Sequence, residues 1–446
     1  MNRFKKVLIF ASILSILIVL PIFNTIGRIY WGIKVNGIDI GGQTVEEATV
    51  ELQPVITLTE NRNIELTAGN QHWSFSPKEL GIRLDLKRTL QSAYSLGRTG
   101  RFTERSKELY RLIDTGNNLP LTLDVDEAKL DKVLQYIGRD VNIDPQKAEF
   151  KFGESRATVV KPSSLGTKML IEESKSKIKV AISAGLNRTE LVMLPVESKV
   201  SEKVINRFGN LDIIARFTTE FDETDTNRTN NVVQAAENLH GSVINAGETF
   251  SFNQVVGHRG VEEGYKEAKV IVDKKFVTDV GGGVCQVSTT LYNAALLADM
   301  SIVERTEHSR PVKYIPPGLG ATVAYGLIDL KIRNPLDAPV LVLSNVDSGK
   351  LTVYLLGKRL AGKDVTIEST DYSEIEPKVI EKVSSSVYEG QQIPEVQGSP
   401  GYQVTTWREV KQDGKTVRRE LISKDRIEPE DALILIGNQK LRGSSE

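Results

Sequence analysis

Residues 281–300 read GGGVCQVSTTLYNAALLADM, three consecutive glycines that lead into a cysteine and then into an apolar pattern. Glycine accepts positive φ angles, so the triplet predicts a tight turn or a close approach to another part of the backbone. Val287, Leu291 and Ala294 then recur at helical spacing, which predicts a helix over residues 286–300. Cys285 is therefore expected at the N-terminus of a helix.

Cys285 is the only cysteine in the chain. Unpaired N–H groups and the helix dipole stabilise a thiolate at such a position, and the thiolate is the nucleophilic form of cysteine. The N–H groups around it are candidates to hold an oxyanion, and the candidate residues for this role or for supporting it are Gly283, Val284, Gln286, Ser288 and Thr289. Two alternatives stay open, since Ser288 and Thr289 also suit helix capping and a free cysteine is often a small packed hydrophobe.

The N-terminus has the pattern of an export signal. Arg3, Lys5 and Lys6 precede an apolar run over residues 7–23, which is close to the minimum length for spanning a bilayer. We predict an uncleaved signal-anchor over residues 1–29, with its basic end in the cytoplasm and the rest of the chain outside. A cleaved signal peptide is the alternative. In either case an unpaired cysteine in an exported protein is a candidate reactive thiol.

The composition excludes several classes of protein. The chain has 446 residues, of which 40% are hydrophobic and 26% charged, and this is ordinary globular material long enough for several domains. A formal net charge of -1 gives no basic field, so nucleic acid is not an expected partner. The four histidines are far apart in the sequence, so neither a metal site nor a cofactor is predicted.

Residues 30–205 contain an internal duplication. The first copy opens a helix at residues 44–48 and carries PKELG at 77–81, and the second opens a helix at residue 126 and carries PSSLG at 162–166. The two helix starts and the two Pro-x-x-Leu-Gly elements are separated by nearly the same number of residues. This spacing indicates duplicated domains at 30–116 and 117–205 rather than short solenoid repeats. Neither copy contains a catalytic cluster.

Residues 206–362 are expected to form an α+β domain. Strands are predicted at 211–217, 269–272, 321–325, 330–332 and 339–343, around helices at 228–239 and 286–300 and without a regular βαβ alternation. His308 follows the cysteine helix, and a return turn would bring its imidazole to the thiol as the activating base; the alternative is a surface histidine in a polar loop. His258 in the turn-like segment GHRG is the competing base, and its alternatives are a structural residue or one that faces substrate.

Four motifs in this domain together resemble the VanW family: FSFN at 250–253, GGGVCQVSTTLYNA at 281–294, Arg-x-x-His-Ser at 305–309 and Tyr-x-Pro-x-Gly at 314–318. The duplicated region is similar to the peptidoglycan-binding domains that precede VanW domains. As chemistry, the resemblance implies L,D-transpeptidation, in which Cys285 attacks a stem-peptide carbonyl, His308 takes the thiol proton and an amine resolves the thioester. Resolution by water would make the same site a carboxypeptidase.

The resemblance also extends to residues around the site. Substrate contacts are expected from His258, Arg259, Ser309, Arg310 and Tyr314. Family members often carry an aspartate where this chain has Gly320, just before Ala321-Thr322-Val323. Asp329 is the possible substitute if that carboxylate orients the histidine.

Residues 363–377 are acidic and weakly hydrophobic, which predicts a linker. Residues 378–437 are strand-rich and punctuated by glycine, and they resemble the small extracellular module named for its five glycines, which is proposed to bind polymers that contain N-acetylglucosamine. Tyr402 and Trp407 are candidates to stack on sugars, although such aromatics also form the core of thin sheets. Residues 438–446 form a polar tail.

The predicted fold class is α+β multidomain: an N-terminal transmembrane helix, a duplicated α+β domain, an α+β VanW domain and a small all-β C-terminal module. The predicted protein is a single-pass membrane protein of Gram-positive type with its bulk on the cell-wall side. Its expected partners are peptidoglycan and, through the N-terminal helix, the cytoplasmic membrane. The alternative from another class is a non-catalytic wall-binding or scaffold protein.

Overall fold

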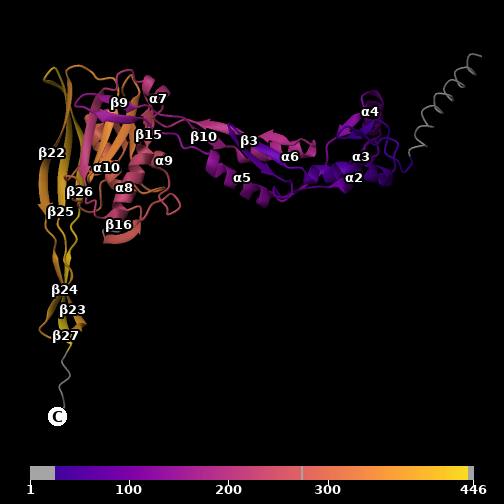
Figure 1. Cartoon of the computed structure of the whole chain (residues 1–446). Helices are drawn as coiled ribbons and strands as arrows, with labels where there is room; N and C mark the ends of the chain where they lie inside the picture. The colour runs from indigo at the N-terminus through magenta and orange to yellow at the C-terminus, as the bar shows by residue number, and fades with distance from the viewer. Residues whose placement is uncertain (1–25, 273–274, 440–446) are drawn as a thin grey trace, which may run out of the picture. The chain divides into compact units, whose positions relative to one another are not determined.

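The computed structural model of the chain describes residues 26–272 and 275–439 (Figure 1). The signal-anchor predicted at residues 7–23 lies outside the described residues. Within the described ranges, none of the helices has the length and apolarity required to span a membrane.

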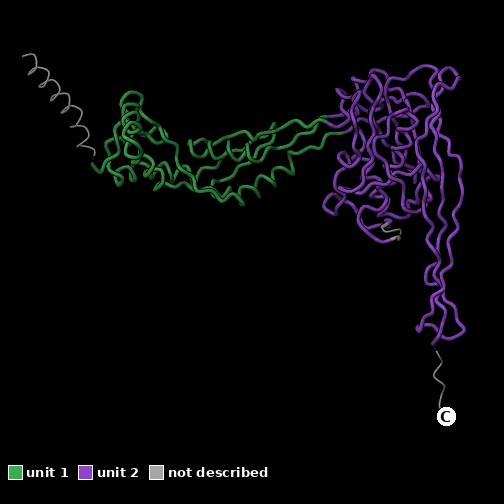
Figure 2. The backbone as a smooth tube through the Cα atoms, turned by 180° about the vertical axis from the view of Figure 1, so that it is seen from behind, with its two compact units in different colours: residues 1–146, 165–197 green, residues 147–164, 198–446 purple. Residues whose placement is uncertain are grey.

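The described residues form two compact units, which are described separately (Figure 2). The first unit holds the chain up to Gln146 together with Leu165–Glu197, and the second holds Lys147–Ser164 and the chain from Ser198 onward. The hairpin of β8 (Glu149–Phe152) and β9 (Ala157–Lys161) therefore belongs to the second unit, although its sequence lies inside the predicted second repeat. The predicted boundaries at 116 and 205 stay predictions.

The first unit is α+β. Its helices are α2 (Val45–Asn61), α3 (Leu86–Ser95), α4 (Phe102–Asp114), α5 (Glu127–Val141) and α6 (Ile171–Ser183). Its strands are β1 (Ile33–Val35), β2 (Ile38–Asp39), β3 (Ile64–Ala68), β4 (Gln71–Phe75), β5 (Ile82–Leu84), β6 (Asn117–Leu119), β7 (Leu123–Val125), β10 (Gly166–Met169), β11 (Arg188–Glu190) and β12 (Met193–Val196).

Two helices of this unit start where the sequence predicts, because a side chain caps each of them. Thr44 Oγ1 accepts from Glu47 N (3.1 Å), and the Glu47 carboxylate accepts from Thr44 N (2.8 Å), which is a capping box before α2. Asp126 caps α5 by accepting from Lys129 N (3.0 Å).

The cores of this unit do not separate the two predicted repeats. One core gathers residues from β3 and β5 of the first repeat with residues from α5 and α6 of the second. The strands connect the repeats as well, because β3 pairs in parallel with β11 and β5 pairs antiparallel with β7. One core and two strand pairs therefore join the two predicted repeats.

The second unit is built on the antiparallel sheet β13-β21-β20-β14, against which α8 and α10 pack (Figure 1). The helices of the unit are α7 (Glu202–Asn206), α8 (Thr226–Leu239), α9 (Phe252–Val256) and α10 (Val284–Leu297). The strands of this part are β13 (Ile213–Glu220), β14 (Ser242–Ile244), β15 (Thr249–Ser251), β16 (Glu267–Val272), β17 (Lys275–Val280), β18 (Ser301–Glu304), β19 (Lys331–Arg333), β20 (Val340–Asp347) and β21 (Lys350–Leu356).

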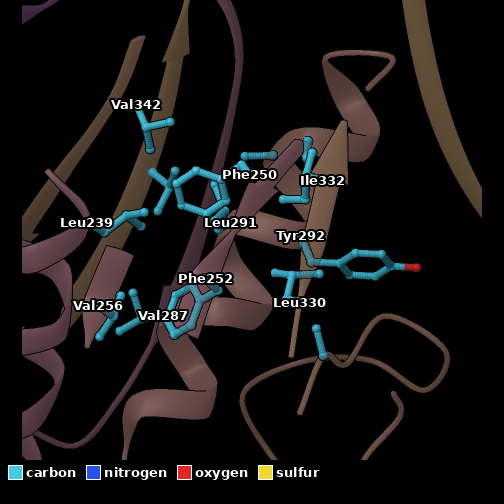
Figure 3. Close-up of a cluster of buried hydrophobic side chains, with 14 of the residues drawn as sticks. Leu239, Phe250, Phe252, Val256, Val287, Leu291, Tyr292, Leu330, Ile332 and Val342 are labelled. Carbon is cyan, nitrogen blue, oxygen red and sulfur yellow. The ribbon is translucent and has the colours of Figure 1, made fainter. Parts of the chain in front are cut away.

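Helix α10 lies at the centre of the largest core. Val287 and Leu291 are fully buried, and they meet side chains from α8, α9 and the sheets in the cluster that Figure 3 shows. The predicted helices at 228–239 and 286–300 are confirmed as α8 and α10. The strand predicted at 321–325 is wrong, because only isolated bridges at Thr322 and Ala324 occur there.

The C-terminal part is all β. The antiparallel sheet β22-β25-β26 contains β22 (Lys363–Ile375), β25 (Gly401–Gln412) and β26 (Lys415–Ile427). The second sheet, β23-β27-β24, contains β23 (Val379–Tyr388), β24 (Gln392–Val396) and β27 (Ala432–Gln439). The linker predicted at 363–377 is wrong, since these residues form β22. The mixed α+β fold with a β-rich end is confirmed.

Candidate active site around Cys285

The glycine triplet forms the turn that starts α10. Gly281 and Gly283 have φ angles of 90° and 112°, and Gly283 is the N-cap residue of α10. A Cβ on Gly282 would lie 2.6 Å from the carbonyl oxygen of Lys269, and one on Gly283 would lie 3.2 Å from Arg228 Cγ. Both the left-handed backbone and the close packing against α8 and β16 therefore require glycine here.

The first turns of α10 are polar but fully buried, with Gln286, Ser288 and Thr289 all at 0% exposure. Gln286 Nε2 donates to Thr219 Oγ1 and to the carbonyl of Glu220, both at 3.0 Å. Ser288 Oγ donates to the carbonyl of Ala321 (2.6 Å), and Thr289 Oγ1 accepts from Ala321 N (3.0 Å). These hydroxyls anchor residue 321 against the helix instead of facing a ligand.

Cys285 is half-buried in the first turn of α10. Its Sγ donates to the carbonyl of Val323 (3.4 Å). Burial raises the pKa of the Cys285 thiol, and Arg259 and Arg228 counteract that effect only in part. The direction is opposite to the one that the helix N-terminus alone predicts, so the unliganded protein keeps the thiol protonated.

His308 is buried, at 7% exposure, and both of its ring nitrogens meet hydroxyl groups. Nδ1 lies 2.7 Å from Thr322 Oγ1, and Nε2 lies 2.9 Å from the Tyr314 hydroxyl. Burial, with a smaller contribution from Arg305, lowers the pKa of His308 to about 4, so the imidazole is neutral at pH 7. Among the described residues no hydrogen bond joins His308 to Cys285, and the direct pair that the sequence suggests is not formed.

Tyr314 connects the surroundings of the two residues. Its hydroxyl binds His308, and its ring lies 5.9 Å from the guanidinium carbon of Arg228. Burial raises the pKa of the Tyr314 hydroxyl, and a negative charge on Cys285 raises it further, so the phenol stays protonated. Tyr314 therefore contacts the imidazole with its neutral hydroxyl and Arg228 with its ring.

The carboxylates differ from the expectation. Asp329 accepts from Ser251 Oγ (2.5 Å) and Asn253 N (2.9 Å), so it holds the FSFN segment, and no hydrogen bond joins it to His308 among the described residues. The carboxylate next to the histidine is Glu307, which accepts from His308 N (2.8 Å). A Cβ on Gly320 would overlap Glu307 Oε1 and lie 2.7 Å from His308 Cδ2. Glu307 therefore fills the space that a side chain at position 320 would need.

Two arginines flank Cys285. Arg259, which the sequence suggests as a substrate contact, donates to Asn253 Oδ1 (2.6 Å). Arg228, which the sequence analysis missed, donates to Gln286 Oε1 (2.8 Å). The sequence carries one indication that Arg228 is functional. A cation in the first turn of a helix is unfavourable because of the helix dipole, so its presence there suggests a role other than helix stability.

The remaining predicted contacts lie in other surroundings. His258 is exposed, with Nδ1 at 3.1 Å from Glu263 Oε2. Ser309 is exposed, and Arg310 pairs with Glu430 (3.0 Å) before the last strand. Tyr402 is 5% exposed in a small core, as the core alternative expects.

Trp407 is half-buried on β25. The guanidinium carbon of Arg419 lies 5.1 Å from the centroid of the Trp407 ring.

Within the described part of the chain, no group of three or more His, Cys, Asp or Glu side chains is arranged to hold a metal ion.

The sheet β22-β25-β26 supports the site from the other end of α10. Arg408 on β25, at 5% exposure, donates to the carbonyls of Met300 (2.7 Å) and Leu296 (3.3 Å), which caps the C-terminal end of the helix. Arg305, just before Glu307, pairs with Asp425 on β26 (2.6 Å). Sequence reasoning missed these contacts because their partners are more than a hundred residues apart.

Three protein families match parts of the chain. The family described as "VanW like protein" matches residues 227–356, "Putative peptidoglycan binding domain" matches 73–190, and "G5 domain" matches 366–439. The match at 73–190 overlaps parts of both predicted repeats.

Relatives among known proteins match as well. "Uncharacterized protein YoaR" of Bacillus subtilis (strain 168) is 32% identical over 53% of this chain and 77% of its own length. "Vancomycin B-type resistance protein VanW" of Enterococcus faecalis (strain ATCC 700802 / V583) is 35% identical over 28% of this chain and 47% of its own length.

Two solved structures resemble the C-terminal part. The G5 domain of an IgA1 protease is 18% identical, with a TM-score of 0.15, over 18% of this chain and 94% of its own. The G5 domain of HP0197 is 19% identical, with a TM-score of 0.13, over 17% of this chain and 97% of its own.

Proposed function

This chain belongs to the VanW family, and from that premise we propose that it is a cell-envelope protein that binds peptidoglycan and acts on its stem peptides through Cys285. Two domain matches support the binding part, one to a peptidoglycan-binding domain and one to a G5 domain. The proposed location is the outer side of the cytoplasmic membrane, with residues 7–23 as a single-pass anchor.

One observation carries the proposed chemistry: the only cysteine of the chain lies half-buried in the first turn of α10, where the charges of Arg259 and Arg228 favour its thiolate. In the proposed reaction the sulfur forms a bond to a stem-peptide carbonyl carbon. The C–N bond then breaks, the amine leaves with a proton, and a thioester remains. An amine of a second stem, or water, displaces the sulfur, which regains a proton.

The thiol proton has to leave before the attack. In the proposed path the Tyr314 hydroxyl, which binds Nε2 of His308 at 2.9 Å, takes the thiol proton while it gives its own to Nε2. The hydroxyl first has to approach the thiol, because Cys285 Sγ donates to the carbonyl of Val323 in the resting protein. This transfer is uphill in the unliganded protein, because the thiol pKa is raised and the imidazole pKa is lowered. Arg228 and Arg259 offset part of that cost, since a cation nearby favours the thiolate.

A non-catalytic wall-binding protein is the second candidate. The protonated thiol and the lack of a direct contact between His308 and Cys285 among the described residues favour it. Under this alternative Cys285 is a packed residue, and the glycine triplet only lets α10 approach α8 and β16.

Mass spectrometry of peptidoglycan fragments separates the two candidates. The full chain in detergent, wild type and Cys285→Ala, is incubated with disaccharide-tetrapeptide stems. Cross-linked dimers that form only with the wild type indicate a transpeptidase, and stems shortened by one residue indicate a carboxypeptidase. If neither product forms while both proteins still bind isolated wall sacculi, the binding-only candidate is correct.

A further inference from the structure

The aliphatic parts of two arginine side chains pass along the glycine triplet that precedes Cys285. A Cβ on Gly281 would lie 3.5 Å from Arg259 Cβ, and a Cβ on Gly283 would lie 3.2 Å from Arg228 Cγ. Arg259 comes from the segment after α9, and Arg228 comes from the first turn of α8. Two elements far apart in the sequence thus bring cations to the same turn.

Neither guanidinium is neutralised by a carboxylate. No salt bridge of Arg228 or Arg259 occurs among the described residues, and each of them donates to one neutral amide oxygen, at 2.8 Å on Gln286 and 2.6 Å on Asn253. Arg259 Nε is buried without a hydrogen-bond partner. Both arginines are only half-buried, and each guanidinium carries five N–H donors, so both retain donors for a further acceptor.

Other groups near this turn leave the positive charge in place. The raised pKa values of the Cys285 thiol and of the Tyr265 and Tyr314 hydroxyls keep these groups neutral at pH 7. Asp329 is the acidic group that acts on Arg259, and its oxygens are already held by Ser251, Asn253 and Leu330. The N-terminal end of α10 adds partial positive charge of its own.

We propose that Arg228 and Arg259 bind the free terminal carboxylate of a peptide whose preceding carbonyl lies against Cys285. Guanidinium groups bind carboxylates through paired charge-assisted hydrogen bonds, which gives both affinity and orientation. The inference rests on the proposed function and makes its substrate class specific: the site takes stem peptides that end one residue beyond the attacked bond. Stems with an amidated terminus are poor ligands.

Alkylation of Cys285 tests carboxylate recognition without requiring turnover. Iodoacetate and iodoacetamide carry the same reacting carbon, but only iodoacetate carries a carboxylate, and both react with the same thiolate fraction. The ratio of their rates therefore reports the carboxylate site alone. Because the chain has a single cysteine, labelling of the full chain in detergent is unambiguous.

The expected ratio favours iodoacetate in the wild type. It falls about tenfold in Arg228→Gln and in Arg259→Gln, since each variant loses one charge-assisted hydrogen bond. Arg62→Gln removes the same charge from an exposed position in the other compact unit and should leave the ratio unchanged. A ratio that does not respond to either site arginine, or that falls equally in the control, overturns the inference. So does a folded protein that resists both reagents.

A second measurement needs no variant. N-acetyl-D-alanine should protect wild-type Cys285 from iodoacetamide, and its C-terminal amide should not. Equal protection by both compounds, or protection by inorganic phosphate but not by N-acetyl-D-alanine, contradicts a peptide carboxylate site. Selective protection without product from tetrapeptide stems would retain the carboxylate site and refute the acyl-transfer function.

Discussion

Replacing Arg408 by Met should destabilise the core around α10, although residue 408 belongs to the C-terminal sheet. Arg408 is 5% exposed and donates to two carbonyls at the C-terminal end of α10 and to Glu420 Oε1 (2.5 Å). Methionine keeps most of the volume and removes the charge. Breaking a buried charge network of this kind costs about 3–5 kcal/mol.

Cys285 supplies a probe of that core, because it lies on the same helix and is the only thiol. The full chain is exposed to increasing urea, and the midpoint is the concentration at which half of the molecules have unfolded, as measured by the reactivity of Cys285. With a urea dependence of about 1–3 kcal/mol per molar, Arg408→Met should lower this midpoint by at least about 1 M.

Arg419→Met is the matched control, since Arg419 lies on the same sheet but pairs with Glu368 (3.1 Å) at half-exposed positions. An exposed pair contributes about 0–1 kcal/mol, so its midpoint should hardly move. If Arg408→Met and Arg419→Met behave alike, the C-terminal sheet does not cap α10 in the way that the hydrogen bonds indicate.

Three further predictions concern the site. Gly283→Ala should lower the urea midpoint, because a residue with a Cβ at φ 112° carries about 1–3 kcal/mol of strain, while Gly247→Ala, at φ 75° with open space around it, should cost less. The pKa of His308 is lowered to about 4, so the unfolded chain binds a proton at a higher pH than the folded chain does. The free energy of unfolding should therefore fall by about 3 kcal/mol as the pH drops from about 6.5 to 4. His308→Gln should flatten this part of the plot of unfolding free energy against pH. The raised pKa of the Cys285 thiol predicts that iodoacetamide labelling keeps accelerating above pH 8.5, and a plateau near pH 7 would contradict the desolvated thiol.

The start of α10 was predictable because its causes are local. The glycine triplet, the apolar spacing and the cysteine lie within one short stretch, and the left-handed Gly283 and the first-turn position of Cys285 follow from it. The protonation state of the thiol was not predictable. It depends on burial by segments that arrive from elsewhere, among them Val323.

Two wrong predictions have a common physical origin, since both misjudge which groups form hydrogen bonds with the backbone. Residues 321–325 have the composition of a strand, but the N–H and carbonyl of Ala321 bind the side chains of Thr289 and Ser288 in place of a neighbouring strand. Residues 363–377 lack a hydrophobic face because most of β22 is exposed, yet its backbone pairs with β25 along its length. Hydrophobic periodicity cannot detect either arrangement.

The surroundings of His308 were also beyond sequence reasoning. The sequence indicates only that a return turn could bring His308 to Cys285, whereas the pKa of His308 depends on its burial and on Arg305, which Asp425 holds from β26. The Glu307 carboxylate occupies the space that a side chain at position 320 would need. Only the packing of the two segments against each other reveals this.

The assignment of Lys147–Ser164 to the second unit has a mechanical consequence. The chain crosses between the units near residues 146, 164 and 197, so three covalent connections join them. When the two units are pulled apart, three connections in parallel divide the load. A protease that cuts one crossing would leave the units attached through the other two.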